Sequence, residues 1–187
     1  MVGAVKARKI IVEKLEIKPG DKILDIGCGP ADILEYLPAD IEYTGFDNNE
    51  NYINSAKKQF KNRGNFFCKE VSTDLLKNEM LETNSFNVVL AFGILHHLTD
   101  EKAKSLFELA KAVLIKGGKL ITLDGCYTEN QPLITKFMLK LDRGDFVRTK
   151  QEYIKLANYH FVDLRTEISS NLLNMPYTLI VMNGIKN

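Results

Sequence analysis

The sequence lacks an excess of charge of either sign. Lys and Arg together number 25 and Asp and Glu number 24, so the formal net charge of the 187-residue chain is only +1. Proteins that bind nucleic acid use clustered positive charge to attract its phosphates. The near balance of charge gives no indication of such a partner, and no nucleic acid is expected.

Long hydrophobic runs and a secretory leader are also missing. No apolar stretch approaches the roughly 20 residues of a membrane span, and the start, Met1 to Lys6, has no basic segment followed by an apolar one. The three cysteines, Cys28, Cys68 and Cys126, are an odd number without CxxC spacing. That pattern supports neither a disulfide framework nor a zinc site. We expect a cytoplasmic protein with no membrane partner and no metal.

Proline is scarce, with five residues, whereas 45% of the chain is hydrophobic and 9% is aromatic. This composition excludes a disordered chain, and the length suits one domain with a proper core. No repeat or linker interrupts the sequence. We therefore expect a single domain over residues 1–187, beginning with a helix within residues 1–18.

Short apolar runs alternate with segments of helical period over the first two thirds of the chain. The clearest helix has Asp100 and Glu101 in its first turn and is expected to end at Gly117-Gly118. Such alternation predicts right-handed crossovers and a parallel sheet covered by helices on both faces. The expected strands are Lys22–Ile26, Ile41–Phe46, Asn65–Lys69, Phe86–Phe92 and Lys119–Leu123, and the other expected helices run from the glycine loop to Leu37 and from Glu50 to Phe60.

The last third of the chain does not continue this alternation of strands and helices. Two helices, Leu133–Leu141 and Lys150–Ala157, precede two strands, Leu164–Ser169 and Tyr177–Met182. The link between the strands is short and therefore more like a hairpin than a crossover. The predicted fold class is α/β, a mostly parallel sheet closed by an antiparallel strand.

Two glycines follow the first expected strand, and an acid follows the second. Gly27 and Gly29 let the backbone turn sharply and leave room for a ligand. Asp47, 22 residues beyond Asp25, is placed to accept hydrogen bonds from the two hydroxyls of a ribose. Ligands of such sheets bind at the carboxyl ends of the strands, so the combination predicts an adenosine-containing ligand.

The glycine loop also indicates which adenosine ligand fits. A dinucleotide site has a third glycine where the pyrophosphate meets a helix N-terminus. Here that position is the anionic Asp32, and Pro30 removes a nearby N–H donor. The loop therefore suits a neutral or positively charged nucleoside better than a diphosphate, and S-adenosylmethionine fits that description.

Five motifs carry a resemblance to a known family. Ile23 to Pro30 closely resembles the first motif of class I S-adenosylmethionine-dependent methyltransferases, and four further matches follow in order: Gly45–Asp47, Ser85–Val89, Leu95–Leu98 and Leu114–Gly118. The resemblance covers about residues 20–125. It implies a Rossmann-like, doubly wound sheet of seven strands, one of them antiparallel. It also implies methyl transfer from S-adenosylmethionine to a small-molecule acceptor by in-line displacement, with S-adenosylhomocysteine as product.

The resemblance implies a cofactor site, position by position. The methionine part is assigned to the first loop, the ribose to Asp47, the adenine to the residues after the second and third strands, and the methyl group to the end of the fourth strand. The residues so assigned are Asp25, Gly27, Cys28, Gly29, Asp47, Asn48, Tyr52, Glu70, Val71, Phe92 and Gly93.

Some of these residues have a plainer interpretation. Asp25 could bind loop amides alone, and Glu70, which stands where the family has aspartate, could be a surface charge. Cys28 is interpreted as a small buried filler rather than a reactive thiol, and Cys68 and Cys126 as packing residues.

His96 and His97 follow the fourth strand and are the candidates for a general base. A neutral imidazole could take a proton from an acceptor hydroxyl. Adjacent residues cannot both face one pocket, so one of them is expected to pack near the helix start at Thr99-Asp100. A base is required only if the acceptor must lose a proton.

The acceptor side is expected to involve the stretch 125–150, which is longer than a simple turn. We interpret it as a lid, with Tyr127, Arg143 and Arg148 as candidate substrate or lid residues and a monomer or homodimer as the assembly. Enzymes that methylate DNA bases or glutamine amides carry Asn/Asp-Pro-Pro-Tyr after the fourth strand, where this chain has Ala91 to Ile94. A small molecule is therefore the expected acceptor.

Two other functions stay open. A non-catalytic S-adenosylmethionine-binding module would keep the glycine loop and Asp47 but lack a productive acceptor pocket. A nicotinamide-dependent dehydrogenase is disfavoured by the loop chemistry and by the absence of a Tyr-x-x-x-Lys pair.

Overall fold

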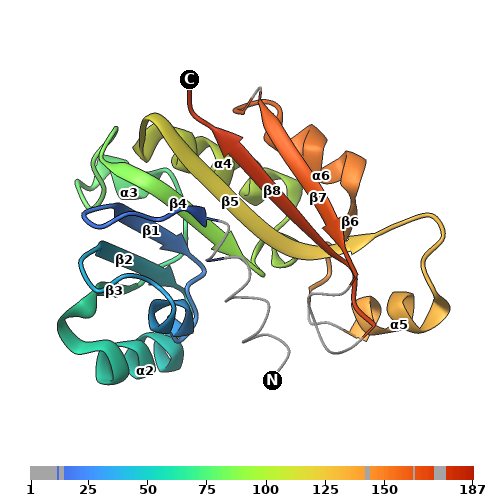
Figure 1. The fold of residues 1–187 in the computed structure, drawn as a ribbon, viewed down its shortest axis with the longest axis horizontal. Coiled ribbons are helices and arrows are strands. Elements are labelled where there is room, and N and C mark those ends of the chain that lie inside the picture. The colour runs from blue at the N-terminus through green and yellow to red at the C-terminus, as the bar shows by residue number, and fades with distance from the viewer. Residues whose placement is uncertain (1–11, 13–14, 142–143, 162, 171–175) are drawn as a thin grey trace.

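The fold is built around one mixed β-sheet with the strand order β3-β2-β1-β4-β5-β8-β7, and β6 pairs with β5 beside that path. The computed structural model describes residues 12, 15–141, 144–161, 163–170 and 176–187. Figure 1 shows β8 lying between β5 and β7. The strands are β1 (Lys22–Ile26), β2 (Glu42–Asp47), β3 (Asn65–Cys68), β4 (Phe86–Phe92), β5 (Leu114–Tyr127), β6 (Arg148–Thr149), β7 (Leu164–Ser169) and β8 (Leu179–Ile185).

The direction of the strands confirms the predicted fold class. Strands β1 to β5 pair in parallel, whereas β8 is antiparallel to both of its neighbours, β5 and β7. The strand order reverses between β1 and β4, which are neighbours in the sheet. In such sheets the loops at the carboxyl ends of the strands beside this reversal form the ligand site.

Helices cover both faces of the sheet. The α-helices are α2 (Glu50–Phe60), α3 (Asp74–Lys77), α4 (Asp100–Val113), α5 (Leu133–Leu141) and α6 (Lys150–Ala157), and the 3-10 turns are η1 (Asp32–Glu35), η2 (Lys61–Arg63) and η3 (Leu95–His97). Among the described residues no helix is long and apolar enough to cross a membrane.

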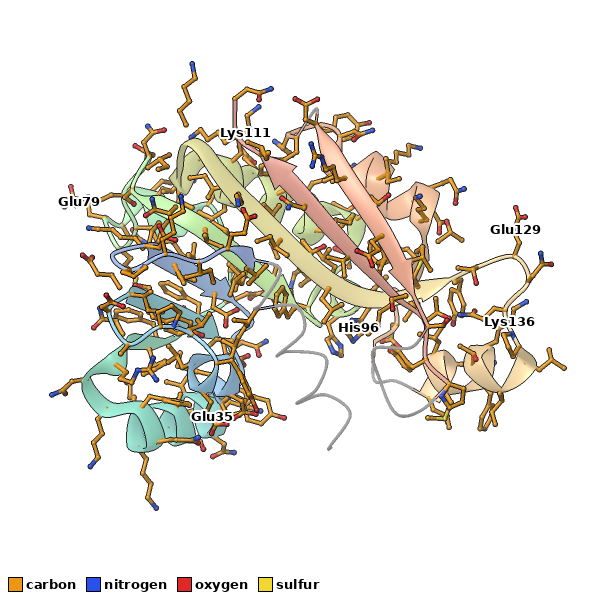
Figure 2. The ribbon with its side chains drawn as sticks, in the orientation of Figure 1. Glu35, Glu79, His96, Lys111, Glu129 and Lys136 are labelled. Atoms are coloured by element: carbon orange, nitrogen blue, oxygen red, sulfur yellow. The ribbon has the colours of Figure 1, made fainter. Side chains whose placement is uncertain are left out.

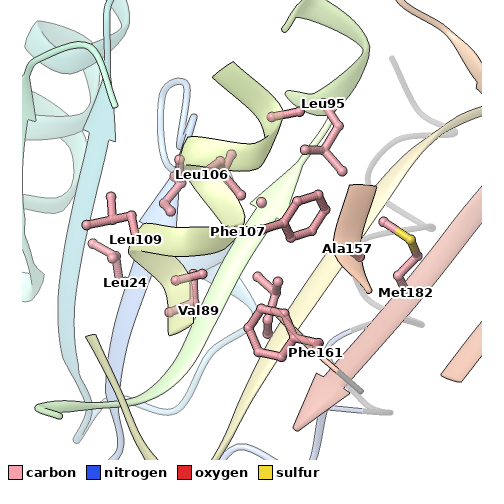
Figure 3. Close-up of a cluster of buried hydrophobic side chains, with 14 of the residues drawn as sticks. Leu24, Val89, Leu95, Leu106, Phe107, Leu109, Ala157, Phe161 and Met182 are labelled. Carbon is pink, nitrogen blue, oxygen red and sulfur yellow. The ribbon is translucent and has the colours of Figure 1, made fainter. Parts of the chain in front are cut away.

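The alternation of side chains along each strand divides the core into two layers. Leu24 and Val89 pack with α4 and α6 on one face, whereas Ile23 and Leu90 pack with α2 on the other. Neighbouring strand residues point to opposite faces, so strands buried on both sides are apolar throughout. Figure 3 shows Phe107 of α4 at the centre of the first layer, among side chains from the sheet and α6.

One predicted helix end is wrong. Helix α4 ends at Val113 rather than at Gly117-Gly118, and those glycines lie in an irregular part of β5. The last carbonyls of α4 are bound instead by Asn84 N–H, by Ser85 N–H and by the ammonium of Lys186. Because these donors come from distant parts of the chain, no glycine is needed to end the helix.

The predicted helix after the glycine loop is also wrong in extent. The chain there forms only the 3-10 turn η1, which follows Ala31 at φ 58°. Pro30 and Pro38 bracket too few residues for a stable helix, and the residue before a proline avoids helical backbone angles. Strand β8 begins two residues and ends three residues later than expected. No sequence signal that we recognised indicated α3, β6, η2 or η3. The expected N-terminal helix lies mostly outside the described residues.

Candidate functional site

The glycine loop folds back onto the end of β2. The amides of Gly27 and Cys28 both donate to the carbonyl of Phe46, at 2.8 and 3.0 Å. Gly27 and Gly29 have φ angles of +75° and +55°, in the left-handed region that favours glycine. A side chain on Gly29 would meet no atom within 4 Å. The loop is therefore open at Gly29, whereas a Cβ on Gly27 would lie 2.7 Å from the side chain of Ile94.

Asp47 ends β2 beside this loop. Its Oδ2 accepts from Gly29 N–H at 2.9 Å, and its Oδ1 accepts from Asn49 N–H at 2.8 Å. The two amides fix the carboxylate, while each oxygen keeps lone pairs for a further donor. A half-buried carboxylate held in this way can bind the two hydroxyls of a ribose.

Exposed aromatic rings lie on two elements that follow Asp47 in the chain, α2 and β3. Tyr52 on α2 is 44% exposed, and Phe67 on β3 is 37% exposed and stacks on Phe46 with ring centroids 5.1 Å apart. Asn48 is exposed as well. Exposed rings near a carboxylate that can bind a ribose suit the flat face of a base.

Asp25 is buried at the end of β1, where it is 4% exposed. Its Oδ2 accepts from the hydroxyl of Tyr43 on the neighbouring strand at 2.5 Å. Tyr43 had no assigned role in the sequence, because nothing in its local pattern distinguishes it from a core residue.

Cys28 packs against β2 and is half-buried. A side chain on Gly45 would lie 2.9 Å from the Cys28 sulfur, so the glycine makes room for the thiol. Burial raises the pKa of Cys28, and the nearby Asp25 and Asp47 raise it further. The thiol is therefore a weak nucleophile, in agreement with its interpretation as a filler.

The other residues assigned to the adenine and the methyl group lie after β3 and at the end of β4, two strands that β2 and β1 separate in the sheet. Glu70 after β3 is exposed and forms an ion pair with Lys102 of α4, while Val71 packs against the core. Phe92 ends β4. Gly93 follows it at φ +67°, and its amide donates a hydrogen bond to the carbonyl of Leu123.

The two histidines have different surroundings. His96 is buried, and its Nδ1 lies 2.8 Å from Oδ1 of Asp124, which also accepts from the His96 amide. His97 is exposed, and its ring lies 4.1 Å from that of His96. Figure 2 shows His96 at the edge of the sheet that faces α5. One of the two histidines is therefore packed, as expected, but His96 packs against Asp124 of β5 and not at the helix start Thr99-Asp100.

Asp124, near the end of β5, is a site residue that the sequence reasoning missed. It is 1% exposed, and burial raises its pKa although the hydrogen bond from His96 acts in the opposite direction. Among the described residues its Oδ2 has no hydrogen-bond partner. The sequence does contain a signal for Asp124: it directly follows an expected buried strand, at the carboxyl edge of the sheet. The same pattern identified Asp47.

The guanidinium of Arg148 on β6 makes its hydrogen bonds to other groups of the protein. Its Nη1 donates to the carbonyls of Leu95 and Phe146, both at 2.9 Å. Its Nη2 donates to Leu98 O at 2.7 Å and to Asp100 Oδ1 at 2.8 Å, and Nε also donates to that carboxylate at 3.1 Å. All five N–H groups are used. The geometry leaves no donor for a substrate, so the assignment of Arg148 as a substrate residue is wrong. The side chain instead acts as a clamp: it holds the loop after β4 in place through hydrogen bonds.

The remaining lid candidates are only partly described. Tyr127 ends β5 and is half-buried, whereas Arg143 lies outside the described residues. Within the stretch 125–150 the structure has the end of β5, helix α5 and β6.

The described residues contain no group of His, Cys, Asp and Glu that could hold a metal ion. By contrast, the open glycine loop, the fixed Asp47 carboxylate and the exposed aromatic rings fit an adenosine ligand. The structure places Gly27 and Gly29 against the end of β2 with Asp47, and Asp25 near the end of the adjacent strand β1. That these residues hold a cofactor stays a prediction.

Comparisons with known proteins agree with this geometry. The family described as "Methyltransferase domain" matches residues 23–118, just over half of the chain. Phosphoethanolamine N-methyltransferase 1 of Arabidopsis thaliana is 30% identical over 165 residues, which are 87% of this chain and 30% of that protein. Demethylmenaquinone methyltransferase of Staphylococcus haemolyticus is 28% identical over 169 residues, covering 83% of this chain and 68% of the relative.

A solved structure supports the fold. Phosphoethanolamine N-methyltransferase 2 of Haemonchus contortus, in complex with phosphomonomethylethanolamine and S-adenosylhomocysteine, superimposes with a TM-score of 0.74 at 15% identity, over 96% of this chain and 52% of that one. The chain spans less than a third of the length of the plant relatives that it matches. From the family match and the site geometry together, the chain belongs to the methyltransferase-domain family and, through it, to the class I S-adenosylmethionine-dependent methyltransferases.

Proposed function

We propose that the protein transfers a methyl group from S-adenosylmethionine to a small-molecule acceptor. The observation that carries the proposal is Asp47, whose carboxylate is fixed by two backbone amides beside an open glycine loop. The family match over residues 23–118 supports the same cofactor.

The proposed cofactor contacts follow the order of the strands. Asp47 binds the ribose, and Asp25 with the loop Gly27-Cys28-Gly29 holds the methionine part. On the adenine side the proposed residues are Asn48, Tyr52, Glu70 and Val71, and beneath the methyl group they are Phe92 and Gly93. Glu70 reaches the adenine only by giving up its ion pair with Lys102, which is exposed and therefore weak.

The cofactor supplies a methyl group already activated by a positive sulfur, with S-adenosylhomocysteine as product. The chain's own residues have to align the acceptor with that methyl, an effect worth up to roughly 7–11 kcal/mol in well-oriented systems. His97, which is exposed after β4, is the proposed general base for an acceptor that must lose a proton. His96, fixed by Asp124, positions the neighbouring His97.

The small-molecule acceptor is proposed from two observations. The relatives named above act on phosphoethanolamine and demethylmenaquinone. The loop after β4 carries histidines rather than the Pro-Pro-Tyr signature of enzymes that methylate DNA bases or glutamine amides. Tyr127 at the end of β5 and the stretch 125–150 are the proposed acceptor cover, with Arg148 acting through the loop that it holds.

Calorimetric titration tests the cofactor first. The purified chain is titrated with S-adenosylmethionine, S-adenosylhomocysteine and NAD, alone and as Asp47→Asn. We expect both sulfur nucleosides to bind and NAD not to bind. Because the substitution removes a charged acceptor of two hydrogen bonds, it should weaken binding about 10- to 200-fold.

The control variant is Asp40→Asn, an exposed acid just before the opposite end of the same strand. It should leave the affinity unchanged. Tight binding of NAD would favour the dehydrogenase, and no nucleoside binding at all would leave only the fold. If the sulfur nucleosides bind but no acceptor in a small-molecule screen is methylated, the non-catalytic binding module becomes the better account.

A cytoplasmic location and a monomeric or homodimeric state complete the proposal. Cys28, Cys68 and Cys126 are all free thiols, which fits a reducing compartment. Light scattering of the purified chain measures the assembly directly.

A further inference from the structure

The most exposed apolar side chains gather on one short helix. Leu133, Ile134, Phe137 and Leu141 of α5 are 84%, 60%, 60% and 62% exposed. Among the described residues only Tyr159 is a further large apolar side chain exposed to that extent. Scattered single apolar residues are ordinary on a surface, but a contiguous group of four on one helix marks an interaction site.

The group forms one face of α5, here called the α5 face. Successive helix residues turn by about 100°, so these four side chains span roughly a third of the circumference. On the opposite side Thr135 and Leu139 are buried, and Leu139 packs with Leu179 of β8. The helix is therefore docked on the domain by one side and presents a second apolar side outward. Figure 1 shows α5 projecting from the far end of the sheet.

Positive charge borders the α5 face. Lys136 and Lys140, the only charged residues of the helix, are one turn apart and exposed. The same helical geometry places them side by side along one edge of the apolar face. Within the part of the chain that the structure describes, neither lysine forms an ion pair. In Figure 2 Glu129, on the preceding loop, points away from the helix.

We propose that the α5 face docks onto a lipid bilayer that carries negative charge. Leucine and phenylalanine enter the boundary between headgroups and acyl chains, while lysines at the edge reach the phosphates with their flexible stems. Each lysine near an anionic surface adds to the binding. Docking of this kind needs no membrane-spanning helix, and it revises the expectation of no membrane partner.

The charge pattern favours this occupant over a second copy of the chain. A two-fold contact between two α5 faces would bring four lysines together without a carboxylate from either helix. An anionic surface instead supplies the opposite charge. The inference goes beyond the proposed function and does not rest on it, because vesicle binding requires neither cofactor nor acceptor.

The test is co-sedimentation of the full chain with vesicles of phosphatidylcholine alone and of phosphatidylcholine with one third phosphatidylglycerol. We expect binding to the anionic vesicles and little to the neutral ones. Phe137→Ser combined with Leu141→Ser should lower the partition coefficient at least about tenfold, because two apolar side chains no longer enter the bilayer. Lys136→Glu with Lys140→Glu should lower it roughly 10- to 100-fold.

Two matched variants serve as controls. Lys57→Glu with Lys58→Glu makes the same change in net charge on α2, and Tyr159→Ser removes an exposed ring from outside the α5 face. Both should bind anionic vesicles as the unmodified chain does, and all variants should keep its Tm because the altered side chains are exposed. Equal binding of the α5 variants and the controls would overturn the proposal. So would the absence of vesicle binding, or a stable dimer that Phe137→Ser dissociates.

Discussion

Removing the guanidinium of Arg148 tests how the loop that carries His97 is held. The change is Arg148→Ala. The side chain is 7% exposed and makes five hydrogen bonds, to the carbonyls of Leu95, Leu98 and Phe146 and to the carboxylate of Asp100. Its loss leaves partly buried carbonyls without a donor.

The magnitude follows from what each contact is worth. A hydrogen bond to a charged group contributes about 1.5–3 kcal/mol, and removing one member of a buried, hydrogen-bonded charge set costs about 3–5 kcal/mol in all. Asp100 is 61% exposed, so water replaces that partner and the ion pair itself adds little. We expect a loss of about 3–5 kcal/mol from a total unfolding free energy of about 5–15 kcal/mol.

Urea unfolding measures the loss, and hydrogen exchange locates it. The amides of Phe146 and Leu98 donate to His96 and Leu95 at 3.0 and 3.2 Å, and both should exchange faster in Arg148→Ala. Arg63→Ala is the matched control, since Arg63 donates to the carbonyls of Leu34, Leu37 and Pro38 in the other half of the domain.

Arg63→Ala should also lower the unfolding free energy. Once that global loss is taken into account, the hydrogen exchange of the amides of residues 95–98 should be unchanged. If Arg148→Ala costs less than about 1 kcal/mol, or if both variants affect these amides equally, the clamp is not what holds this loop.

Three shorter predictions concern other parts of the domain. Burial raises the pKa of Cys126 to about 11, so at pH 8 iodoacetamide should modify exposed Cys68 and spare Cys126; equal labelling by peptide mass spectrometry would contradict this. The Thr149 amide donates to Glu152 and holds the pKa of that carboxyl below its usual value. This stabilisation is present above about pH 4.5 and is lost as pH falls through the lower folded pKa. Glu152→Gln should therefore flatten the acid dependence of Tm, and an unchanged pH profile would exclude the capping box as its source. Phe107→Ala, at a fully buried position, should cost about 3–5 kcal/mol in urea unfolding, and a loss below about 1 kcal/mol would show that the core closes around the gap.

The parts of the fold that local pattern controls could be predicted. Helix α2 and strand β4 have the expected bounds, because apolar spacing and an Asn49 cap act within a few residues. The glycine loop and Asp47 were predictable for a related reason. Parallel strands end at one edge, so residues that close successive strands must lie near one another.

What could not be predicted depends on partners distant in the sequence. Asp124 lies 28 residues beyond His96, and only the register of β4 against β5 brings the two together. Arg148 was interpreted as a substrate or lid residue because an arginine in a long connection carries no mark of its acceptors, which are the Asp100 carboxylate and backbone carbonyls up to 53 residues away.

The placement of β8 has a consequence for how the domain forms during synthesis. Strand β7 pairs with β8 and with no other described strand, although it leaves the ribosome first. Strand β7 therefore cannot join the growing sheet until residues 179–185 have been made and have paired with β5. The five-stranded parallel half can assemble early, while its β5 edge stays open until residues 179–185 have been made. A nascent chain stopped before residue 179 would carry β7 as an unpaired segment and expose β5 as an edge open to pairing with another chain.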